Sequence, residues 1–192
     1  MARGVRAFVA VETPPEVQEQ AGRVIQRLRA SSAHVKWVDA GQLHWTIKFL
    51  GNVELDEVPE ICDALSVAVA GAVPFDVEAL GVGAFPDIHR PRTVWIGMGH
   101  GSEEMIALHG AIERSLAELG YRTEGRRFRP HLTIGRVRHS AEEIGELGKL
   151  IQQNAEFAAA MSSVFEVVLF SSELARTGPV YEPLARVELK GR

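Results

Sequence analysis

Two short stretches of the sequence repeat one pattern of side chains that can move protons and bind phosphate. His44 and Thr46 stand in the first stretch, and His131 and Thr133 stand in the second. Side chains at positions i and i+2 of a β-strand share a face, so each histidine points the same way as its threonine. One imidazole can accept a proton while another donates one near neutral pH. The pattern therefore predicts acid–base chemistry on a phosphodiester, with hydroxyl donors for its oxygens.

The repetition carries this interpretation, because a single His-x-Thr is typical of ordinary strands. Zinc binding is the competing chemical interpretation, since histidine is a frequent zinc ligand. Neither motif holds an acidic residue, and the remaining histidines stand in irregular contexts without a third ligand at motif spacing. These histidines are His34, His89, His100, His109 and His139. We therefore expect no metal and no cofactor.

The sequence pattern in the first half of the chain predicts alternating strands and helices that would position His44. Residues 13–16 (TPPE) read as a capping box with proline in the first turn, followed by a helix with an apolar stripe. A second helix is expected at residues 56–70. The expected strands are residues 5–11, 35–38, 43–50, 74–82 and 93–98.

The second half repeats this order. Helices are expected after Ser102 and after residues 140–143 (SAEE), a second capping box, and Gly120 is a natural helix stop. The expected strands are residues 131–137, 163–170 and 180–189. The helix starts at Thr13 and Ser102 precede the two histidines by similar distances, which indicates an internal duplication.

The fold class that follows is α+β. We expect a bilobal duplicated unit with two pseudo-symmetric antiparallel sheets, flanked by helices around a central cleft. Residues 1–192 would form one domain of two intertwined lobes whose boundaries are not contiguous in the sequence. The length of 192 residues and the hydrophobic content of 46% suit a chain that buries a sizeable core without a protein partner.

The net charge of −4 argues against broad, sequence-independent coating of a nucleic acid. A local basic patch nevertheless occurs within residues 122–138, where Glu124 is the only acid. Its arginines are Arg122, Arg126, Arg127, Arg129, Arg136 and Arg138. A solvated charged loop and a phosphate-binding patch both fit this pattern.

Other features of the sequence bear on the compartment. The single cysteine, Cys62, can form no internal disulfide and points to a reducing compartment or to indifference to redox state. No secretory pattern and no run of 18 apolar residues occurs. We expect a cytoplasmic protein that does not bind membranes.

Two segments carry a family resemblance. Residues 44–51 (HWTIKFLG) and 129–136 (RPHLTIGR) resemble the two signatures of the two-histidine (2H) phosphoesterase superfamily, specifically the RNA 2′,3′-cyclic phosphodiesterases once called 2′-5′ RNA ligases. The flanking segment 178–181 (GPVY) agrees with that branch. Gln42 and Trp45 depart from the family pattern, and we expect them to change packing behind the strand without loss of chemistry.

The resemblance implies metal-independent hydrolysis of the 2′,3′-cyclic phosphate at RNA ends to a 2′-phosphate. It implies that His131 activates water, that His44 protonates the departing 3′ oxygen, and that Thr46 and Thr133 hold the phosphate. The residues alone leave the acid and base roles interchangeable, because the two motifs are chemically equivalent.

Three further residues are weaker candidates for substrate contacts. Arg126 and Arg129 could bind phosphates, and Tyr121 could stack on a base. A non-catalytic module that binds nucleotides or RNA ends is the alternative function, and 2′-5′ RNA ligation is a possible side activity. The expected partners are RNA ends or nucleotides with a cyclic phosphate, with no obligate protein partner.

Overall fold

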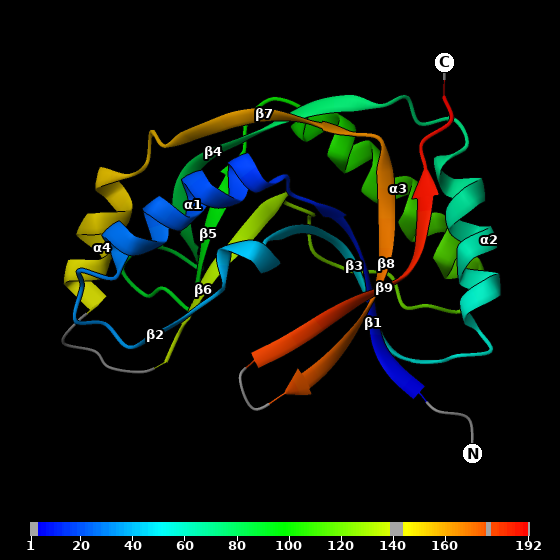
Figure 1. Ribbon diagram of the computed structural model, residues 1–192, viewed down its shortest axis with the longest axis horizontal. Coiled ribbons are helices and arrows are strands. Elements are labelled where there is room, and N and C mark those ends of the chain that lie inside the picture. The colour runs from blue at the N-terminus through cyan, green and yellow to red at the C-terminus, as the bar shows by residue number, and fades with distance from the viewer. Residues whose placement is uncertain (1–3, 139–143, 176–177, 192) are drawn as a thin grey trace.

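The computed structural model describes residues 4–138, 144–175 and 178–191, and its α+β class confirms the predicted one. Four α-helices, one short 3₁₀ helix and nine strands lie in this part of the chain (Figure 1). In chain order they are β1 (Gly4–Glu12), α1 (Pro15–Leu28), β2 (Val35–Trp37), η1 (Ala40–Gln42), β3 (His44–Glu54), α2 (Val58–Val69), β4 (Phe75–Phe85), β5 (Thr93–Met98), α3 (Ser102–Glu118), β6 (His131–Val137), α4 (Ile144–Gln153), β7 (Ala158–Val164), β8 (Glu166–Ala175) and β9 (Gly178–Glu188).

The strands form one curled antiparallel sheet made of two matching halves. The strand order is β7-β4-β5-β6-β3-β1-β8-β9, and β2 pairs with the end of β6 on the edge opposite β5, which it shares with β3. The halves meet where β3 lies beside β6, and Trp45 and Leu132 are the residue pair that joins them. The duplicated unit that we predicted is thus present, with its two sheets connected through a narrow junction.

Each half also repeats an irregularity in its pairing. Ala10 pairs with Thr46 and Val9 with Lys48, which leaves Ile47 as an extra residue in β3. In the other half, Trp95 pairs with Thr133 and Val94 with Gly135, which leaves Ile134 as the extra residue in β6. Each is a β-bulge, which locally reverses the alternation of side chains between the two faces. The bulges therefore determine which later residues of β3 and β6 lie on the same face of the sheet as the histidines.

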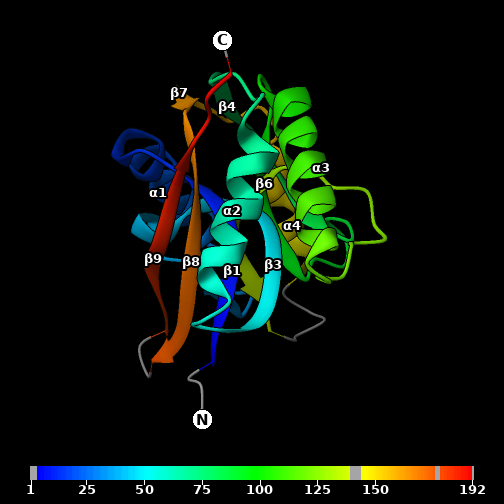
Figure 2. The ribbon, with the colours of Figure 1, turned by 90° about the vertical axis from the view of Figure 1, so that its right-hand side faces the viewer.

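The helices cover one face of the sheet and share a hydrophobic core with it. Helices α1 and α4 lie over the half with β4–β6, while α2 and α3 lie side by side over the half with β3 and β1 (Figures 1 and 2). The predicted stripe of α1 is buried, as its 3.6-residue period requires. Trp45, Ile47, Leu132 and Ile134 all belong to this core.

The predicted helix caps form differently. Helix α1 begins at Pro15 after an N-cap at Pro14 that makes no side-chain hydrogen bond, and the Thr13 hydroxyl instead donates to the carbonyl of Leu43 at 2.7 Å. The capping box was therefore wrong, because a buried tertiary partner outcompetes the local one. Helix α3 follows Gly101, whose φ of +78° is accessible to glycine. The capping box of residues 140–143 lies outside the described residues.

Two strand boundaries also differ. Residues 163–170 were predicted as one strand, but they contain the end of β7 and the beginning of β8, and most of β7 was missed. Its sequence, AAAMSSV, has small and polar residues that give little strand signal. Strand β3 continues past Gly51, which adopts φ +80° beside a second register shift against β1. The predicted strand, residues 43–50, stopped just before that glycine.

The division of residues 1–192 into one domain of two intertwined lobes stays a prediction. Within the described ranges, none of the helices has the length and apolar character that crossing a membrane requires.

We expect Trp45→Ala to reduce the free energy of unfolding by about 3–5 kcal/mol, as large-to-small changes in a packed core do. The Trp45 side chain is 2% exposed and lies directly behind the junction of the two half-sheets. Chemical denaturation would measure the effect. Val67→Ala is the control, because Val67 is 74% exposed, and it should stay within about 0.5 kcal/mol of the parent protein. A similar loss for both variants would contradict the role of the junction.

Candidate active site

The junction of β3 and β6 brings the two His-x-Thr motifs together. Antiparallel register about the Trp45–Leu132 pair sets His44 against Thr133 and Thr46 against His131. Directly opposed side chains have Cβ atoms about 4.5–5.5 Å apart, and diagonal ones about 7–8 Å in regular pairing. All four side chains are half-buried, while Trp45 and Leu132 face the core. The two histidines thus lie diagonally across one junction.

Both imidazoles are oriented in the same way by the backbone. Nδ1 of His44 donates to the carbonyl of Gln42 at 2.9 Å, and Nδ1 of His131 donates to the carbonyl of Arg129 at 2.7 Å. A carbonyl oxygen can only accept, so each Nδ1 carries a hydrogen and each Nε2 is the nitrogen free to exchange a proton. The side chain of Gln42 in turn donates to the Pro179 carbonyl at 2.8 Å, which ties η1 to β9.

Aromatic rings pack against both histidines, but the two sets differ. The His44 ring lies 4.9 Å from Phe8 and 5.2 Å from Tyr181, which it meets edge-on at 88°. The His131 ring lies 5.1 Å from Phe85, at 87°. These contacts limit ring rotation and exclude water from one side of each imidazole.

The surroundings lower the proton affinity of both histidines. Burial lowers the pKa of His44 below its usual value of 6.5, and the hydrogen bond to Gln42 only partly opposes this effect. Burial likewise lowers the pKa of His131 against the opposing bond to Arg129, and the positive charge of Arg136 lowers it further. Both rings therefore hold their second proton less tightly than a free imidazole does.

Arg136 lies near the site, although simple strand alternation predicts that it faces the other side of the sheet. Simple alternation puts it on the face opposite His131, but the bulge at Ile134 reverses the order. Arg136 is exposed. Burial lowers the pKa of His131 and raises that of Tyr181, and the positive charge of Arg136 lowers both, so Arg136 acts on one residue of each half-sheet. Its place in the arginine patch was noted from the sequence, but its role at the site was missed.

Phe49 is the corresponding residue of the first half. The bulge at Ile47 turns Lys48 into the core and leaves Phe49 62% exposed on the histidine face. Its ring lies 5.9 Å from Phe8, the ring that packs on His44. No sequence signal marked it, because an alternating strand would bury it.

The three weaker candidates are placed unequally. Arg129 is exposed next to His131 and fixes it through its carbonyl, and Arg126 is exposed in the same loop. Tyr121 instead packs against the main core, and burial, followed by the charges of Glu57 and Glu60, raises its pKa. This position is on the helix-covered side of the sheet. We therefore leave Tyr121 out of the proposed contacts, because a core position prevents stacking on a base.

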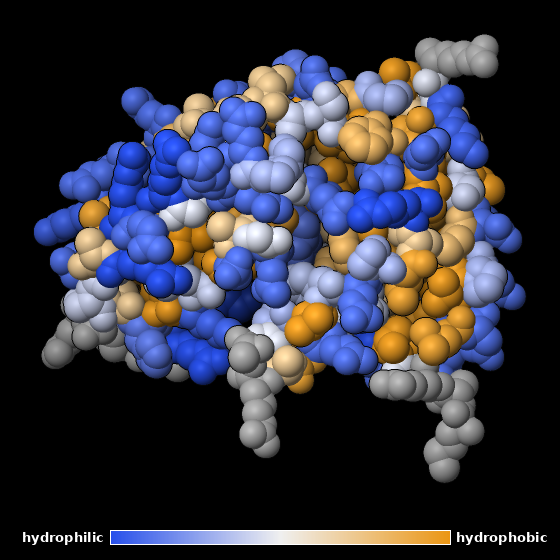
Figure 3. Space-filling view, in the orientation of Figure 1, coloured by the Kyte–Doolittle hydropathy of each residue, from blue (hydrophilic) through white to orange (hydrophobic). Residues whose placement is uncertain are grey.

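A cleft of about 790 Å³ opens beside His44. Its walls come from the end of β1, the beginning of α1, η1, the junction of β7 and β8, and β9, with Tyr181 facing it. This volume is within the usual range of small-molecule sites. On the face shown in Figure 3, hydrophilic side chains gather over α1, and apolar ones gather toward the right-hand side, on the side of α2.

Zinc binding was the competing interpretation, and the part of the chain that the structure describes contains no set of residues that would serve as zinc ligands. No group of three histidine, cysteine, aspartate or glutamate side chains is arranged there to hold a metal ion. Metal independence stays a prediction that chelation must test.

The chain is similar in sequence to known proteins along most of its length. The family model described as the 2′-5′ RNA ligase superfamily matches residues 13–173. The chain is 34% identical over 183 residues to an RNA 2′,3′-cyclic phosphodiesterase of Methanothermobacter thermautotrophicus, covering 92% of this chain and 95% of the relative. It is 34% identical over 168 residues to an RNA 2′,3′-cyclic phosphodiesterase of Aeropyrum pernix, covering 85% and 94%.

Solved structures show the same fold. TT0787 of Thermus thermophilus superposes with a TM-score of 0.79 at 26% identity, covering 97% of this chain and 99% of the other. LigT of E. coli, solved with 3′-AMP, superposes with a TM-score of 0.76 at 25% identity and the same coverage.

Arg136→Gln should raise the pKa of His131 toward 6.5, because it removes a neighbouring positive charge that disfavours the imidazolium. The pKa of His44, on which burial is the dominant influence, should stay where it is. Histidine ¹H–¹⁵N NMR over a pH series would measure both values and would also identify the Nδ1–H tautomer. A fall in the pKa of His131, or an equal shift at both rings, would contradict this placement of Arg136.

Proposed function

This chain belongs to the 2′-5′ RNA ligase superfamily, and we propose that it hydrolyses the 2′,3′-cyclic phosphate at RNA ends to a 2′-phosphate. The observation that carries the proposal is the junction at Trp45 and Leu132, which sets two histidines diagonally across one site. The near full-length likeness to relatives named RNA 2′,3′-cyclic phosphodiesterase supports the choice of substrate.

In the proposed reaction, His131 is the base and His44 is the acid. Nε2 of His131 takes a proton from water as the water oxygen bonds to phosphorus. The bond from phosphorus to the 3′ oxygen breaks, and Nε2–H of His44 protonates that oxygen. The charge of Arg136 beside His131 supports this assignment, since it favours the neutral imidazole that a base must have.

The remaining groups of the site stabilise charge and bind the nucleotide. Thr46 and Thr133 donate hydroxyl hydrogen bonds to the non-bridging oxygens as negative charge gathers there. Arg136 supplies a guanidinium with two parallel donors for the same oxygens. The exposed ring of Phe49 offers a surface on which the terminal base can stack.

Longer substrates have phosphates beyond the cyclic one. Arg126 and Arg129 lie in the exposed segment that leads to His131, and they are the proposed contacts for those phosphates. The proposal includes no metal and no cofactor, because two imidazoles supply both proton transfers. RNA ligation would be a side reaction, in which a 5′ hydroxyl replaces water.

His44→Ala and His131→Ala should each lower turnover of 2′,3′-cyclic AMP by about a hundredfold or more, the usual contribution of a general acid or base. Product formation would be measured by chromatography that separates 2′-AMP from 3′-AMP. His34→Ala is the matched control, because His34 is exposed and lies just before β2, beside the end of β6 that is distant from His131. EDTA should leave the parent activity unchanged. Full activity in either histidine variant would refute the mechanism, and binding of the substrate without turnover would favour a non-catalytic module.

The pH profile of kcat/KM should be a bell with its maximum below about pH 6.5. The acidic limb ends where the base loses its proton, and the alkaline limb begins where the acid loses its own. Burial lowers both pKa values, so both limbs move to lower pH. Initial rates from about pH 4.5 to 8.5 would define the curve. A flat profile, or a maximum above neutral pH, would contradict the histidine pair.

A further inference from the structure

A buried ion pair lies behind the site, on the face of β3 that the helices cover. Nζ of Lys48 contacts Oε1 of Glu113 on α3, and the two side chains are 1% and 10% exposed. Lys48 also donates to the carbonyl of Arg122 at 2.8 Å, and Glu113 accepts from the backbone N–H of Glu124 at 3.0 Å. The pair therefore joins three elements: β3, α3 and the segment that follows α3.

A second contact holds the same segment farther along. The ring of Phe128 stacks on that of His109 with centroids 4.0 Å apart and planes within 3°. His109 lies one helical turn before Glu113 on α3. The segment from Arg122 to Phe128 is thus fastened to one face of α3 at both ends.

This segment needs such anchors because it has no secondary structure of its own. Residues 121–130 form neither helix nor strand. Its charged side chains point into solvent, and four of them are arginines. These four exposed residues are Arg122, Arg126, Arg127 and Arg129. We call residues 122–129 the arginine loop.

The two halves of the fold differ at the position of Lys48. The equivalent position in β6 is Gly135, which pairs at the matching bulge and is covered by the ring of Trp37. An apolar contact is therefore sufficient to build that half. Removing two charges from water is energetically unfavourable, so a buried ion pair is weak evidence of a role in stability alone. Its position indicates a role in fixing the arginine loop.

We propose that Lys48 and Glu113 are positioning residues that hold the arginine loop as a binding element for the RNA phosphates upstream of the terminal cyclic phosphate. The inference rests on the proposed function and extends it, since it assigns a preference for RNA chains over mononucleotides. Arg126 is five residues from His131, so their Cα atoms lie within about 18 Å even in a fully extended chain. The loop is therefore within reach of the nucleotides next to the reacting one.

The test compares kcat/KM for a short oligoribonucleotide with a terminal 2′,3′-cyclic phosphate to kcat/KM for 2′,3′-cyclic AMP. Lys48→Met/Glu113→Leu removes both charges together, so that neither is left buried alone. Arg126→Ala/Arg127→Ala removes loop charge without touching the core. Both should lower the ratio about fivefold or more, through a higher KM for the oligoribonucleotide.

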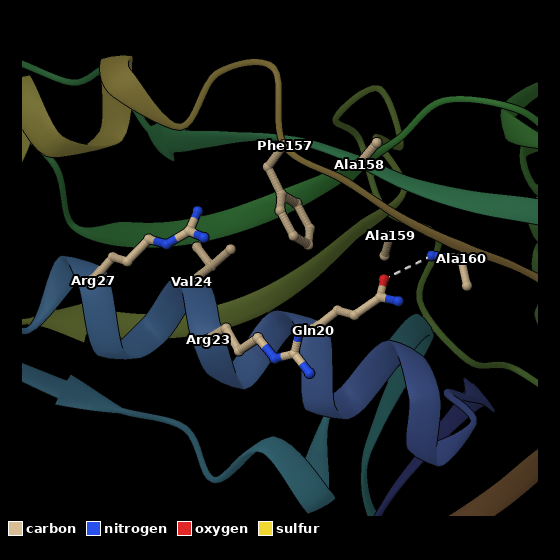
Figure 4. Close-up of a pocket in the computed structure, with 8 residues that line it drawn as sticks. All are labelled: Gln20, Arg23, Val24, Arg27, Phe157, Ala158, Ala159 and Ala160. Atoms are coloured by element: carbon tan, nitrogen blue, oxygen red, sulfur yellow. Dashed lines mark hydrogen bonds between the residues drawn. The ribbon is translucent and has the colours of Figure 1, made fainter.

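The matched control is Arg23→Ala/Arg27→Ala on α1. These arginines line a separate groove of about 410 Å³ between α1 and β7 (Figure 4), and the change in net charge equals that of the loop variant. Arg23 pairs with Glu19, and Arg27 reaches Asn154. The control should keep the ratio of the parent protein.

Salt dependence provides a second measurement that a merely structural role would not change. Each phosphate contact contributes about 0.7 to the slope of log binding against log salt for single strands, so loss of two contacts should flatten the slope for the oligoribonucleotide by about 1.4. The slope for 2′,3′-cyclic AMP has no such upstream contacts to lose. If Lys48→Met/Glu113→Leu does not fold, Lys48→Gln/Glu113→Gln, which also removes both charges but keeps a polar group at each position, replaces it and should also lower the ratio.

An unchanged ratio and slope in folded variants of the pair would overturn the positioning role. An unchanged ratio in the Arg126/Arg127 variant, or an equal fall in the α1 control, would overturn the arginine loop as a phosphate-binding element. Failure of the proposed function gives a different result, because the parent protein would then convert neither substrate.

Discussion

The site depends on one narrow junction, where Trp45 of β3 faces Leu132 of β6. Each half of the molecule brings one histidine and one threonine, and neither half alone can place two imidazoles around a phosphorus atom. The antiparallel register at this pair converts a sequence repeat into a two-sided site, since it sets each histidine against the threonine of the other motif. The buried side chains behind it hold the polar groups of the open face in place.

The sequence was sufficient to predict that each histidine shares a face with its threonine, because period-two alternation holds from His44 to Thr46 and from His131 to Thr133. It fails just beyond them, where each strand contains one extra residue. A bulge has no reliable signature in a single sequence, because it is set by pairing with another strand. Arg136 and Phe49 were missed at the site for this reason. Thr13 and β7 show the same limit, since tertiary contacts and neighbouring strands decided their structures.

Duplication supplies two equivalent histidines, but acid–base catalysis needs them to differ. The structure makes them differ through their neighbours. Phe8 and Tyr181 surround His44, whereas Phe85 and the charge of Arg136 act on His131. The bulges contribute again, because matching positions carry Phe49 in one half and Arg136 in the other. The same backbone feature, a β-bulge, therefore exposes an aromatic ring in one half of the sheet and a cation in the other.

The same asymmetry extends behind the sheet, where Lys48 corresponds to Gly135. A protein with a net charge of −4 repels RNA at long range, so attraction must come from a local concentration of positive charge. Flexible arginines would lose side-chain and backbone entropy on binding each phosphate, and a loop fastened in advance lowers that cost. Burying an ion pair has a large desolvation cost. Its hydrogen bonds to the backbone at Arg122 and Glu124, however, hold a segment that has no helix or strand hydrogen bonds. In the proposed function, weak overall attraction combined with a rigid local patch would favour RNA ends that reach the histidines over RNA in general.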